Sequence, residues 1–250
     1  MKHVVITGAG TGIGRAIAQE MTGEKVALSL LGRRLEPLEE TSSVCHGHTR
    51  VYRCDIRDAA AVQAVFAQLA ADQGPVHALV ANAGIGGANL PGPADRFTDL
   101  VATNLTGTYH CLRAAQAHLE AGPASRHFVV IASILARIGV AGYTGYCASK
   151  AALLGLTRAL AMELAPENVQ VNAVCPGWVN TSMAHEGLEG MASALGVSKA
   201  DALTMAMSDV PLGRMSQPVD IARFVGWLCS DAARGVTGQG LDINNGAFMM

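Results

Sequence analysis

The stretch Val4-Val5-Ile6-Thr7-Gly8-Ala9-Gly10-Thr11-Gly12-Ile13-Gly14 lies near the start of the chain. Its β-branched residues predict a short strand, and the glycines that follow predict a turn. Ile13, Ile17 and Met21 then recur at the spacing of one helix face, so a helix is expected over residues 15–21. The chain therefore begins with a strand, a glycine-rich turn and a helix, in that order.

Further apolar runs of strand length follow, each separated from the last by a segment long enough for a helix. They cover residues 26–31, 51–53, 76–80, 128–132 and 169–174. Helices are expected over residues 35–40 and 59–72, with Asp58 as the N-cap of the second. Runs that are apolar throughout indicate strands buried on both faces. We therefore expect the α/β fold class, with a doubly wound, mostly parallel sheet, helices on both faces and a single domain over residues 1–250.

The composition excludes several classes of protein. Half of the residues are apolar and 15 % are charged, which excludes a disordered chain, a coiled coil and a collagen-like fibre. The formal net charge is −2 with no block of like charge, so neither a nucleic acid nor an anionic membrane is expected as a partner. The apolar run at residues 4–6 is too short for a signal peptide or a membrane span, and we expect a cytoplasmic protein.

The cysteines indicate neither disulfides nor a metal. The six cysteines are scattered without a C-x-x-C pair, so reduced and mostly buried thiols are expected. Cys45-His46-Gly47-His48 offers three metal-binding side chains, but no second group of ligands follows at a suitable spacing. A polar loop without a metal is the prediction for this segment.

The glycine-rich turn is also suited to bind an anion. Unpaired amides and the positive end of the helix dipole favour a phosphate at a helix N-terminus, and glycine lets the phosphate approach the backbone. A glycine cluster alone is weak support, because turns collect glycine for structural reasons. The spacing Gly8-x3-Gly12-x-Gly14 also differs from the common G-x-G-x-x-G fingerprint.

Seven markers in a fixed order resemble the short-chain dehydrogenase/reductase family over essentially the whole chain. They are Thr7-Gly8-x3-Gly12-Ile13-Gly14, Asp55, Asn82-Ala83-Gly84, Asn104, Ser133, Tyr146-x3-Lys150, and Pro176-Gly177 followed by Thr181. Two positions depart from the family's pattern. Ala81 stands where a second asparagine often precedes Asn-Ala-Gly, and Asn244-Asn245-Gly246 replaces the usual Asp-Gly-Gly. The first concerns a loop beside the cofactor, and the second concerns the terminal turn and its subunit contacts.

The resemblance implies a Rossmann-type fold and an oxidoreductase that transfers a hydride between NADP(H) and a ketone or secondary alcohol. In this family Asp55 would accept a hydrogen bond from the adenine amine, residues 82–84 would run beside the adenosine ribose, and Thr181 would bind the nicotinamide carboxamide. The implied catalytic residues are Asn104, Ser133, Tyr146 and Lys150. The implied cofactor-binding residues are Gly8, Thr11, Gly12, Ile13, Gly14, Arg33, Arg34, Asp55, Ile56, Asn82, Ala83, Gly84, Tyr146, Lys150, Pro176, Gly177, Val179 and Thr181.

The end of the second predicted strand favours NADP(H) over NAD(H). A carboxylate at this place would accept hydrogen bonds from the ribose diol and repel a 2′-phosphate. The chain has Gly32 there, followed by Arg33 and Arg34, whose guanidinium groups can bind a phosphate. The alternative is that an arginine only solvates the start of a helix.

Tyr146 and Lys150 are four residues apart, so on a helix they project from one face at about 5–6 Å. A nearby ammonium is expected to lower the phenol pKa from about 10 and make Tyr146 a usable general acid or base. Ser133, thirteen residues earlier, can donate to a substrate carbonyl. Asn104 interrupts an apolar helix. The resemblance implies that it positions Lys150 through a water and completes a proton relay, and a buried structural amide is the alternative. A Tyr-x3-Lys pair by itself also occurs as ordinary packing.

Two further regions bear on substrate and assembly. Residues 182–210 correspond to the family's substrate lid, and their methionines favour a hydrophobic carbonyl substrate, although packing of two helices onto the core explains them equally well. The helical segments 96–121 and 146–164 carry few charges, so a homo-oligomer, either a tetramer or a dimer, is expected.

Two other functions stay open. One is an NAD-dependent alcohol dehydrogenase that works in the oxidising direction. The other is a regulator that senses the nucleotide without turnover, against which the complete set of tyrosine, serine, lysine and asparagine argues.

Overall fold

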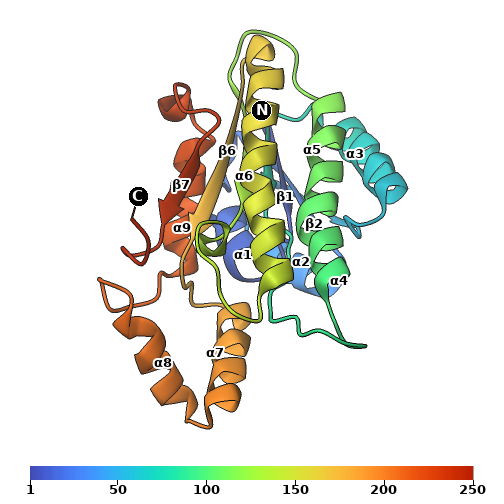
Figure 1. Cartoon of the computed structure of the whole chain (residues 1–250). Coiled ribbons are helices and arrows are strands. Elements are labelled where there is room, and N and C mark those ends of the chain that lie inside the picture. Colours follow the sequence, from blue (N-terminus) through green and yellow to red (C-terminus); the bar gives the residue numbers. More distant parts are fainter. Residues whose placement is uncertain (250) are drawn as a thin grey trace.

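A parallel sheet forms the centre of the molecule in the computed structural model, which describes residues 1–249 (Figure 1). Within these residues seven strands lie in the order β3-β2-β1-β4-β5-β6-β7, and every neighbouring pair is parallel. The strands are β1 (Lys2–Thr7), β2 (Val26–Gly32), β3 (His48–Arg53), β4 (Ala78–Ala81), β5 (Arg126–Ile131), β6 (Val169–Pro176) and β7 (Gly240–Ile243). The predicted fold class is confirmed, with a fully parallel sheet.

Helices cover both faces of the sheet (Figure 1). One face carries α3 (Ala59–Gln73), α4 (Phe97–Val101), α5 (Thr108–Ala117) and α6 (Thr144–Leu164). The other carries α1 (Gly12–Glu20), α2 (Leu35–Ser43) and α9 (Pro218–Leu228). Short 3-10 turns cover Ile134–Ala136, Ala165–Glu167 and Asp231–Ala233. Two separate apolar cores result, one between the sheet and each helix layer.

The strands are apolar throughout because their two faces enter these two cores. In β1, Val5 belongs to the core under α3, α5 and α6, whereas Val4 and Ile6 belong to the core under α1, α2 and α9. Burial of alternate residues in opposite cores leaves no solvent face on a central strand. This is the reason that the sequence showed continuous apolar runs rather than alternation.

The structure corrects the sequence prediction at two places. Residues 97–117 are helical without a break, but a π-helical turn at Ala102–Gly107 interrupts the regular α-helix between α4 and α5, and the helix ends before residues 118–121. Strand β7 was missing from the prediction, since Gly240-Leu241-Asp242-Ile243 is short, polar at Asp242 and only partly buried. The predicted N-cap is confirmed: Asp58 accepts hydrogen bonds from Ala60 N and Ala61 N, both at 3.0 Å.

Helices α7 (Ser182–Leu195) and α8 (Lys199–Ser208) project beyond the end of the sheet at which the strands have their carboxyl ends (Figure 1). Thr181 and Ser198 cap them, because each side chain accepts a hydrogen bond from an amide in the first turn. These helices cover most of residues 182–210, and their action as a substrate lid stays a prediction.

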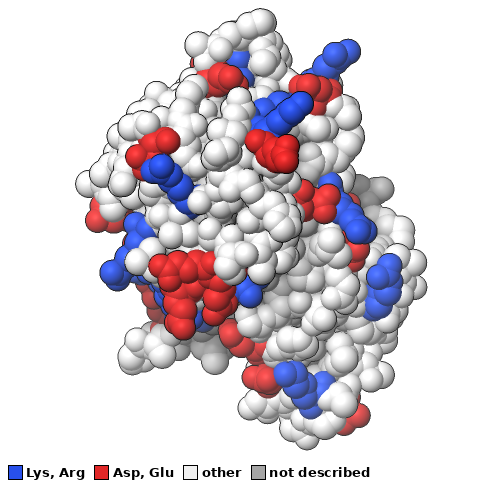
Figure 2. Space-filling model, turned by 180° about the vertical axis from the view of Figure 1, so that it is seen from behind, with Lys and Arg blue, Asp and Glu red and all other residues white. Residues whose placement is uncertain are grey.

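The surface carries groups of both charges. On the face turned away in Figure 1, acidic and basic side chains lie near each other in groups, and wide uncharged areas separate these groups (Figure 2). No helix within residues 1–249 is long and apolar enough to cross a membrane. Within the same residues no three His, Cys, Asp or Glu side chains are grouped as a metal site would require. All six cysteines are free thiols, and Cys54, Cys111, Cys175 and Cys229 are buried, as predicted.

Two buried histidines lie side by side at the amino end of the sheet. The rings of His77 and His127 are 5.9 Å apart, and His77 Nδ1 lies 3.0 Å from a carboxylate oxygen of Glu120. Neither ring nitrogen of His127 has a hydrogen-bond partner within the described chain. Burial, together with the nearby His77 and Lys2, lowers the pKa of His127 to about 4. His127 is therefore neutral in the folded protein at pH 7.

We predict that this arrangement makes the fold sensitive to acid. Above pH 6.5 His127 is neutral in both states, but between pH 6.5 and about 4 only the unfolded chain takes up the proton, so stability falls as the pH falls. The loss is about 3 kcal/mol over this window, at about 1.4 kcal/mol per pKa unit. Urea unfolding at several pH values should show a flatter dependence for His127→Leu, whereas His46→Gln, at an exposed histidine, should behave as wild type. An unchanged slope in His127→Leu would contradict the assignment.

Candidate active site

The sequence-predicted residues meet at the carboxyl ends of β1, β4, β5 and β6. Strand order reverses between β1 and β4, and ligands of open α/β sheets bind at such a switch point. The glycine-rich turn follows β1, Asn82-Ala83-Gly84 follows β4, Ser133 follows β5, and the segment 177–181 follows β6. Tyr146 and Lys150 reach the same end from α6.

The glycine-rich turn is held against the segment after β4. Asn82 Nδ2 donates to Thr7 O at 3.0 Å and to Gly8 O at 3.1 Å. A Cβ on Gly8, which has φ +66°, would lie 2.8 Å from Ala83 Cα. A Cβ on Gly14 would lie 2.2 Å from Gly8 O. Only glycine fits at these two positions while the turn keeps its shape.

The turn has the features of an anion site. Thr11 is the N-cap of α1 and makes no side-chain capping bond, so the amides of the first turn keep their capacity to donate. Unpaired amides at a helix N-terminus fit the phosphates of a dinucleotide. A cavity of about 100 Å³ adjoins the turn and is lined by Gly8, Gly10, Thr11, Gly32, Arg33, Arg34, Pro37 and Leu38. A wider hollow of about 610 Å³ lies along the outer edge of β3, away from these residues.

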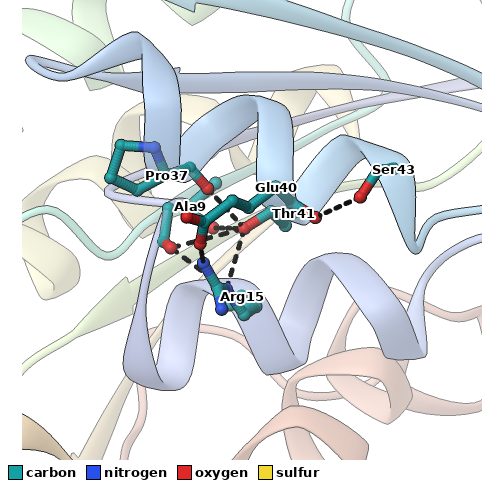
Figure 3. A network of polar contacts seen from close by, with 7 residues as sticks. Ala9, Arg15, Pro37, Glu40, Thr41 and Ser43 are labelled. Carbon is teal, nitrogen blue, oxygen red and sulfur yellow. Dashed lines mark hydrogen bonds and ion pairs between the residues drawn. The ribbon is translucent and has the colours of Figure 1, made fainter.

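A polar network fastens the turn to α1 and α2 (Figure 3). Arg15 Nε donates to Gly10 O and to Thr41 Oγ1, both at 3.1 Å, and Arg15 Nη2 donates to Glu40 at 2.6 Å. The Thr41 hydroxyl also lies 3.1 Å from Ala9 O. Sequence reasoning missed this network, because Arg15 and Thr41 are 26 residues apart and neither belongs to a motif.

Arg33 and Arg34 stand where β2 ends, as predicted, and both are exposed. Arg34 is also the N-cap of α2, and it makes no side-chain capping bond. Both arginines therefore line the cavity beside the glycine-rich turn, and neither side chain caps α2. Such a pair can bind a phosphate by charge-assisted hydrogen bonds.

Asp55 is not a helix cap, since Asp58 fills that role. The Asp55 carboxylate instead faces Arg57, whose Nη2 lies at 2.6 Å and whose backbone N donates at 3.0 Å. The hydrogen bonds from Arg57 lower the pKa of Asp55, and Arg33 adds to this effect. Ile56 packs beneath the π-helical turn, where a Cβ on Gly107 would lie 2.6 Å from Ile56 Cγ1.

Tyr146 and Lys150 share one face of α6, as their spacing predicts. Lys150 Nζ lies 5.8 Å from the centre of the Tyr146 ring and donates to Ile131 O at 2.8 Å. The Tyr146 phenol lies close enough to the Ser133 side chain for that hydroxyl to affect its pKa. The Ser133 hydroxyl also accepts from Leu135 N at 3.1 Å, which fixes its orientation at the end of β5. Ser133, Tyr146 and Lys150 therefore form one cluster.

The pKa of Tyr146 differs from the expectation. Burial raises the pKa of Tyr146, and the nearby Ser133 side chain lowers it by a smaller amount. Burial also lowers the pKa of Lys150 to about 8. The expected depression by the ammonium is absent because both groups lie in a site of low polarity that disfavours their charged forms. The phenol is neutral at pH 7 and is suited to donate a proton.

Asn104 lies in the π-helical turn and is fully buried. Its Oδ1 accepts from Ile85 N at 2.8 Å, and its Nδ2 donates to Ile85 O at 3.0 Å and to Ser149 Oγ at 3.1 Å. A Cβ on Gly84 would lie 3.1 Å from Asn104 Oδ1 and 3.5 Å from Lys150 Nζ. Asn104 therefore fixes the loop after β4 close to Lys150, and its role in a proton relay stays a prediction.

The segment after β6 returns to the glycine-rich turn. Val179 is buried and pairs with Ser216 in an isolated bridge. The Thr181 hydroxyl donates to Val179 O at 3.2 Å and accepts from Ala184 N at 3.4 Å. A Cβ on Gly12 would lie 3.2 Å from Thr181 Cγ2, so the start of α7 touches the turn. Binding of a carboxamide by Thr181 stays a prediction.

The altered C-terminal motif forms a turn beside Pro176-Gly177. A Cβ on Gly177 would lie 3.0 Å from Asn244 Cα, so the two segments are in close contact. Asn244 is buried and its Oδ1 accepts from Gly246 N at 3.0 Å. Asn245 and Gly246 have φ +55° and +86°, and asparagine is one of the few residues besides glycine that tolerates this region. The motif therefore keeps a tight turn despite its altered sequence.

Comparison with known proteins agrees with this geometry. A family model described as enoyl-(acyl carrier protein) reductase matches residues 8–247. The chain belongs to the short-chain dehydrogenase/reductase family. It is an oxidoreductase of that family.

Members of the short-chain dehydrogenase/reductase family match the chain over nearly its whole length. A putative ketoacyl reductase of Streptomyces coelicolor is 35 % identical and covers 97 % of this chain and 95 % of its own. The 3-oxoacyl-(acyl-carrier-protein) reductase FabG of Staphylococcus aureus is 32 % identical, with coverage of 99 % and 98 %. The crystal structure of an actinorhodin polyketide ketoreductase variant with NADPH has a TM-score of 0.88 at 32 % identity, with coverage of 98 % and 97 %.

We predict that Gly14→Ala disrupts the turn. The new Cβ would meet Gly8 O at 2.2 Å and Asn82 Nδ2 at 2.5 Å, so the backbone must shift. We expect a loss of about 2 kcal/mol or more in unfolding free energy and at least a tenfold weaker binding of a dinucleotide. Urea unfolding and fluorescence titration with NADPH measure the two effects. Gly226→Ala, where the nearest atom is Glu20 Cγ at 3.5 Å, is the control: it should leave dinucleotide binding unchanged and should keep or raise the unfolding free energy, because alanine favours a helix more than glycine does.

Proposed function

We propose that the protein reduces a ketone to a secondary alcohol with a hydride from NADPH, or catalyses the reverse reaction, on a predominantly hydrophobic carbonyl substrate. The observation that carries the proposal is the cluster of Ser133, Tyr146 and Lys150 beside the glycine-rich turn. Asn104 supports this cluster through its contacts near Gly84.

Two comparisons support the reaction and the cofactor. The relative from Streptomyces coelicolor carries the name putative ketoacyl reductase, and the similar polyketide ketoreductase structure contains NADPH. Arg33 and Arg34 beside the glycine-rich turn fit a 2′-phosphate, whereas no acid stands between Val26 and Leu35. These observations favour NADP(H) over NAD(H).

The bound cofactor supplies the hydride, and the residues of this chain orient the reactants and move the proton. The amides at the start of α1 would hold the diphosphate of the cofactor, and Lys150 would hold its nicotinamide ribose. Ser133 donates a hydrogen bond to the carbonyl oxygen of the substrate, on which negative charge develops. Burial keeps the Tyr146 phenol protonated, and this phenol gives its proton to the carbonyl oxygen of the substrate. The Lys150 ammonium then stabilises the phenolate that remains.

We also propose that α7 and α8 act as a lid with an apolar inner surface. A Cβ on Gly86 would lie 2.9 Å from Met183 Sδ, so the start of α7 already touches the loop after β4. Leu90, on the same loop, and Ile138 and Val140, after β5, are exposed apolar residues. An apolar rim of this kind fits a hydrophobic carbonyl compound.

Association of identical subunits completes the proposal. Phe97 on α4, Tyr109 on α5 and Met162 on α6 expose large apolar side chains, with 79 % exposure for Met162. Burial of such residues in a second subunit would remove them from water. We propose a homo-oligomer, a tetramer or a dimer.

We predict that the cofactor preference depends on Arg33. Kinetic measurements at 340 nm with NADPH and NADH across aryl, cyclic and acyl ketones should show turnover with NADPH. Arg33→Ala should raise KM for NADPH about tenfold, because a charge-assisted bond to phosphate contributes about 1.5–3 kcal/mol, and it should leave KM for NADH unchanged. Arg223→Ala, at an exposed arginine of α9, is the control. Preference of the wild type for NADH would support the NAD-dependent alternative, and tight binding without any turnover would support the sensor.

We predict that Tyr146→Phe lowers kcat at least about 100-fold, because the proton donor is lost. The affinity for NADPH should stay within a factor of about three, since the phenol oxygen mainly serves the proton transfer. The matched control is Tyr143→Phe, which removes a neighbouring phenol whose i+4 residue is Cys147 rather than a lysine. Near wild-type reduction by Tyr146→Phe would remove Tyr146 from its proposed role.

A further inference from the structure

The first turn of α6, which carries Tyr146, is capped from a distant loop. Helix α6 begins at Thr144, and its N-cap Tyr143 provides no side-chain capping bond. The first amides of a helix have no acceptor within the helix and need one elsewhere. Gly145 N donates to Asn89 Oδ1 at 2.8 Å, across 56 residues of sequence. The residue after Gly145 is Tyr146.

Asn89 lies in the loop after β4 and is 6 % exposed. Its Nδ2 donates to Asp95 Oδ1 and lies within reach of Thr144 Oγ1, both at 3.0 Å. Its backbone N donates to Gly142 O at 2.8 Å. Asn89 therefore contacts the residues on both sides of the helix start, and both polar atoms of its side chain are used.

Asp95 extends the connection to a second helix. The oxygen that accepts from Asn89 also accepts from Phe97 N at 2.9 Å, in the first turn of α4. The two helix starts are in direct contact, since a Cβ on Gly145 would lie 3.0 Å from Leu100 Cδ1 and 3.1 Å from Phe97 Cα. The pair Asn89 and Asp95 thus ties the N-termini of α4 and α6 together where no other cap fixes the start of α6.

We propose that Asn89 is a positioning residue for Tyr146 and that Asp95 holds Asn89 in place. This proposal rests on the proposed function of Tyr146 as the proton donor. The phenol must meet both the Ser133 hydroxyl and the substrate oxygen, and its place depends on the first turn of α6. A shift of about 1 Å in a reacting group can cost about 100-fold in rate. Loss of the Asn89 bonds frees this turn while the glycine-rich turn and Lys150, which is held at Ile131 O, keep their places.

The test compares Asn89→Ala with a matched asparagine. We expect Asn89→Ala to lower kcat for ketone reduction about 10- to 100-fold while the Kd for NADPH, from fluorescence titration, stays within about twofold. Asn172→Ala is the control, because it removes a buried asparagine that bonds Val236 O and Gln239 N and makes none of these contacts with α6. It should lower the melting temperature without a selective loss of kcat.

A second variant, at Asp95, tests the same connection between α4 and α6. Asp95 is exposed, so Asp95→Ala is expected to fold, and it should lower kcat in the same direction by about 3- to 10-fold. The proposal is overturned if kcat of Asn89→Ala stays within about twofold of wild type. It is also overturned if kcat and NADPH affinity fall together in Asn89→Ala.

Hydrogen exchange followed by mass spectrometry gives a readout that needs no turnover. The peptide that contains residues 142–150 should exchange faster in Asn89→Ala than in wild type and should be unchanged in Asn172→Ala. Equal exchange in wild type and Asn89→Ala would overturn the capping of α6 by Asn89. Absence of ketone reduction by the wild-type protein would instead overturn the proposed function, so the two failures are distinguishable.

Discussion

The close approach between the glycine-rich turn and Asn82-Ala83 is the contact on which the rest of the site depends. Strands β1 and β4 are neighbours at the place where the strand order reverses. The glycine-rich turn passes so close to the end of β4 that a side chain on Gly8 or Gly14 would have no space. Asn82 fills the remaining space and satisfies the carbonyls of Thr7 and Gly8. Since the amides of α1 face outward only when the turn keeps this shape, the anion site and the placement of the loop after β4 follow from a single steric requirement.

Side-chain hydrogen bonds also hold the loops of the site against neighbouring helices. Asn104 fixes the loop after β4 through Ile85, and Arg15 and Thr41 fix the glycine-rich turn from α1 and α2. These bonds are buried or partly buried, where a polar group without a partner is costly, so each one restricts the loop to few conformations. The site is therefore preorganised by side chains that do not themselves touch a reacting atom.

Much of the fold could be predicted from the sequence because its signals are local. Apolar runs identified six of the strands, and the polar start of α3 identified its cap. The spacing of Tyr146 and Lys150 predicted their common helix face. Burial could not be predicted in the same way, which is why the expected change in the pKa of Tyr146 had the wrong sign. The networks around Thr41 and Asn89 were missed for a related reason: they join residues that become neighbours only after the sheet has formed.

The π-helical turn at Ala102–Gly107 has a consequence for how α5 packs. A regular α-helix advances about 100° per residue, so a wider turn inserted between α4 and α5 changes the phase of every side chain that follows it. The phase observed here directs Cys111, Leu112 and Ala115 into the core. A π-helical turn holds one residue more than a regular turn, so it keeps those three side chains in phase with the core while it places Asn104 against Ile85 and Ser149. The irregular turn thus sets both the packing register of α5 and the place of a buried amide.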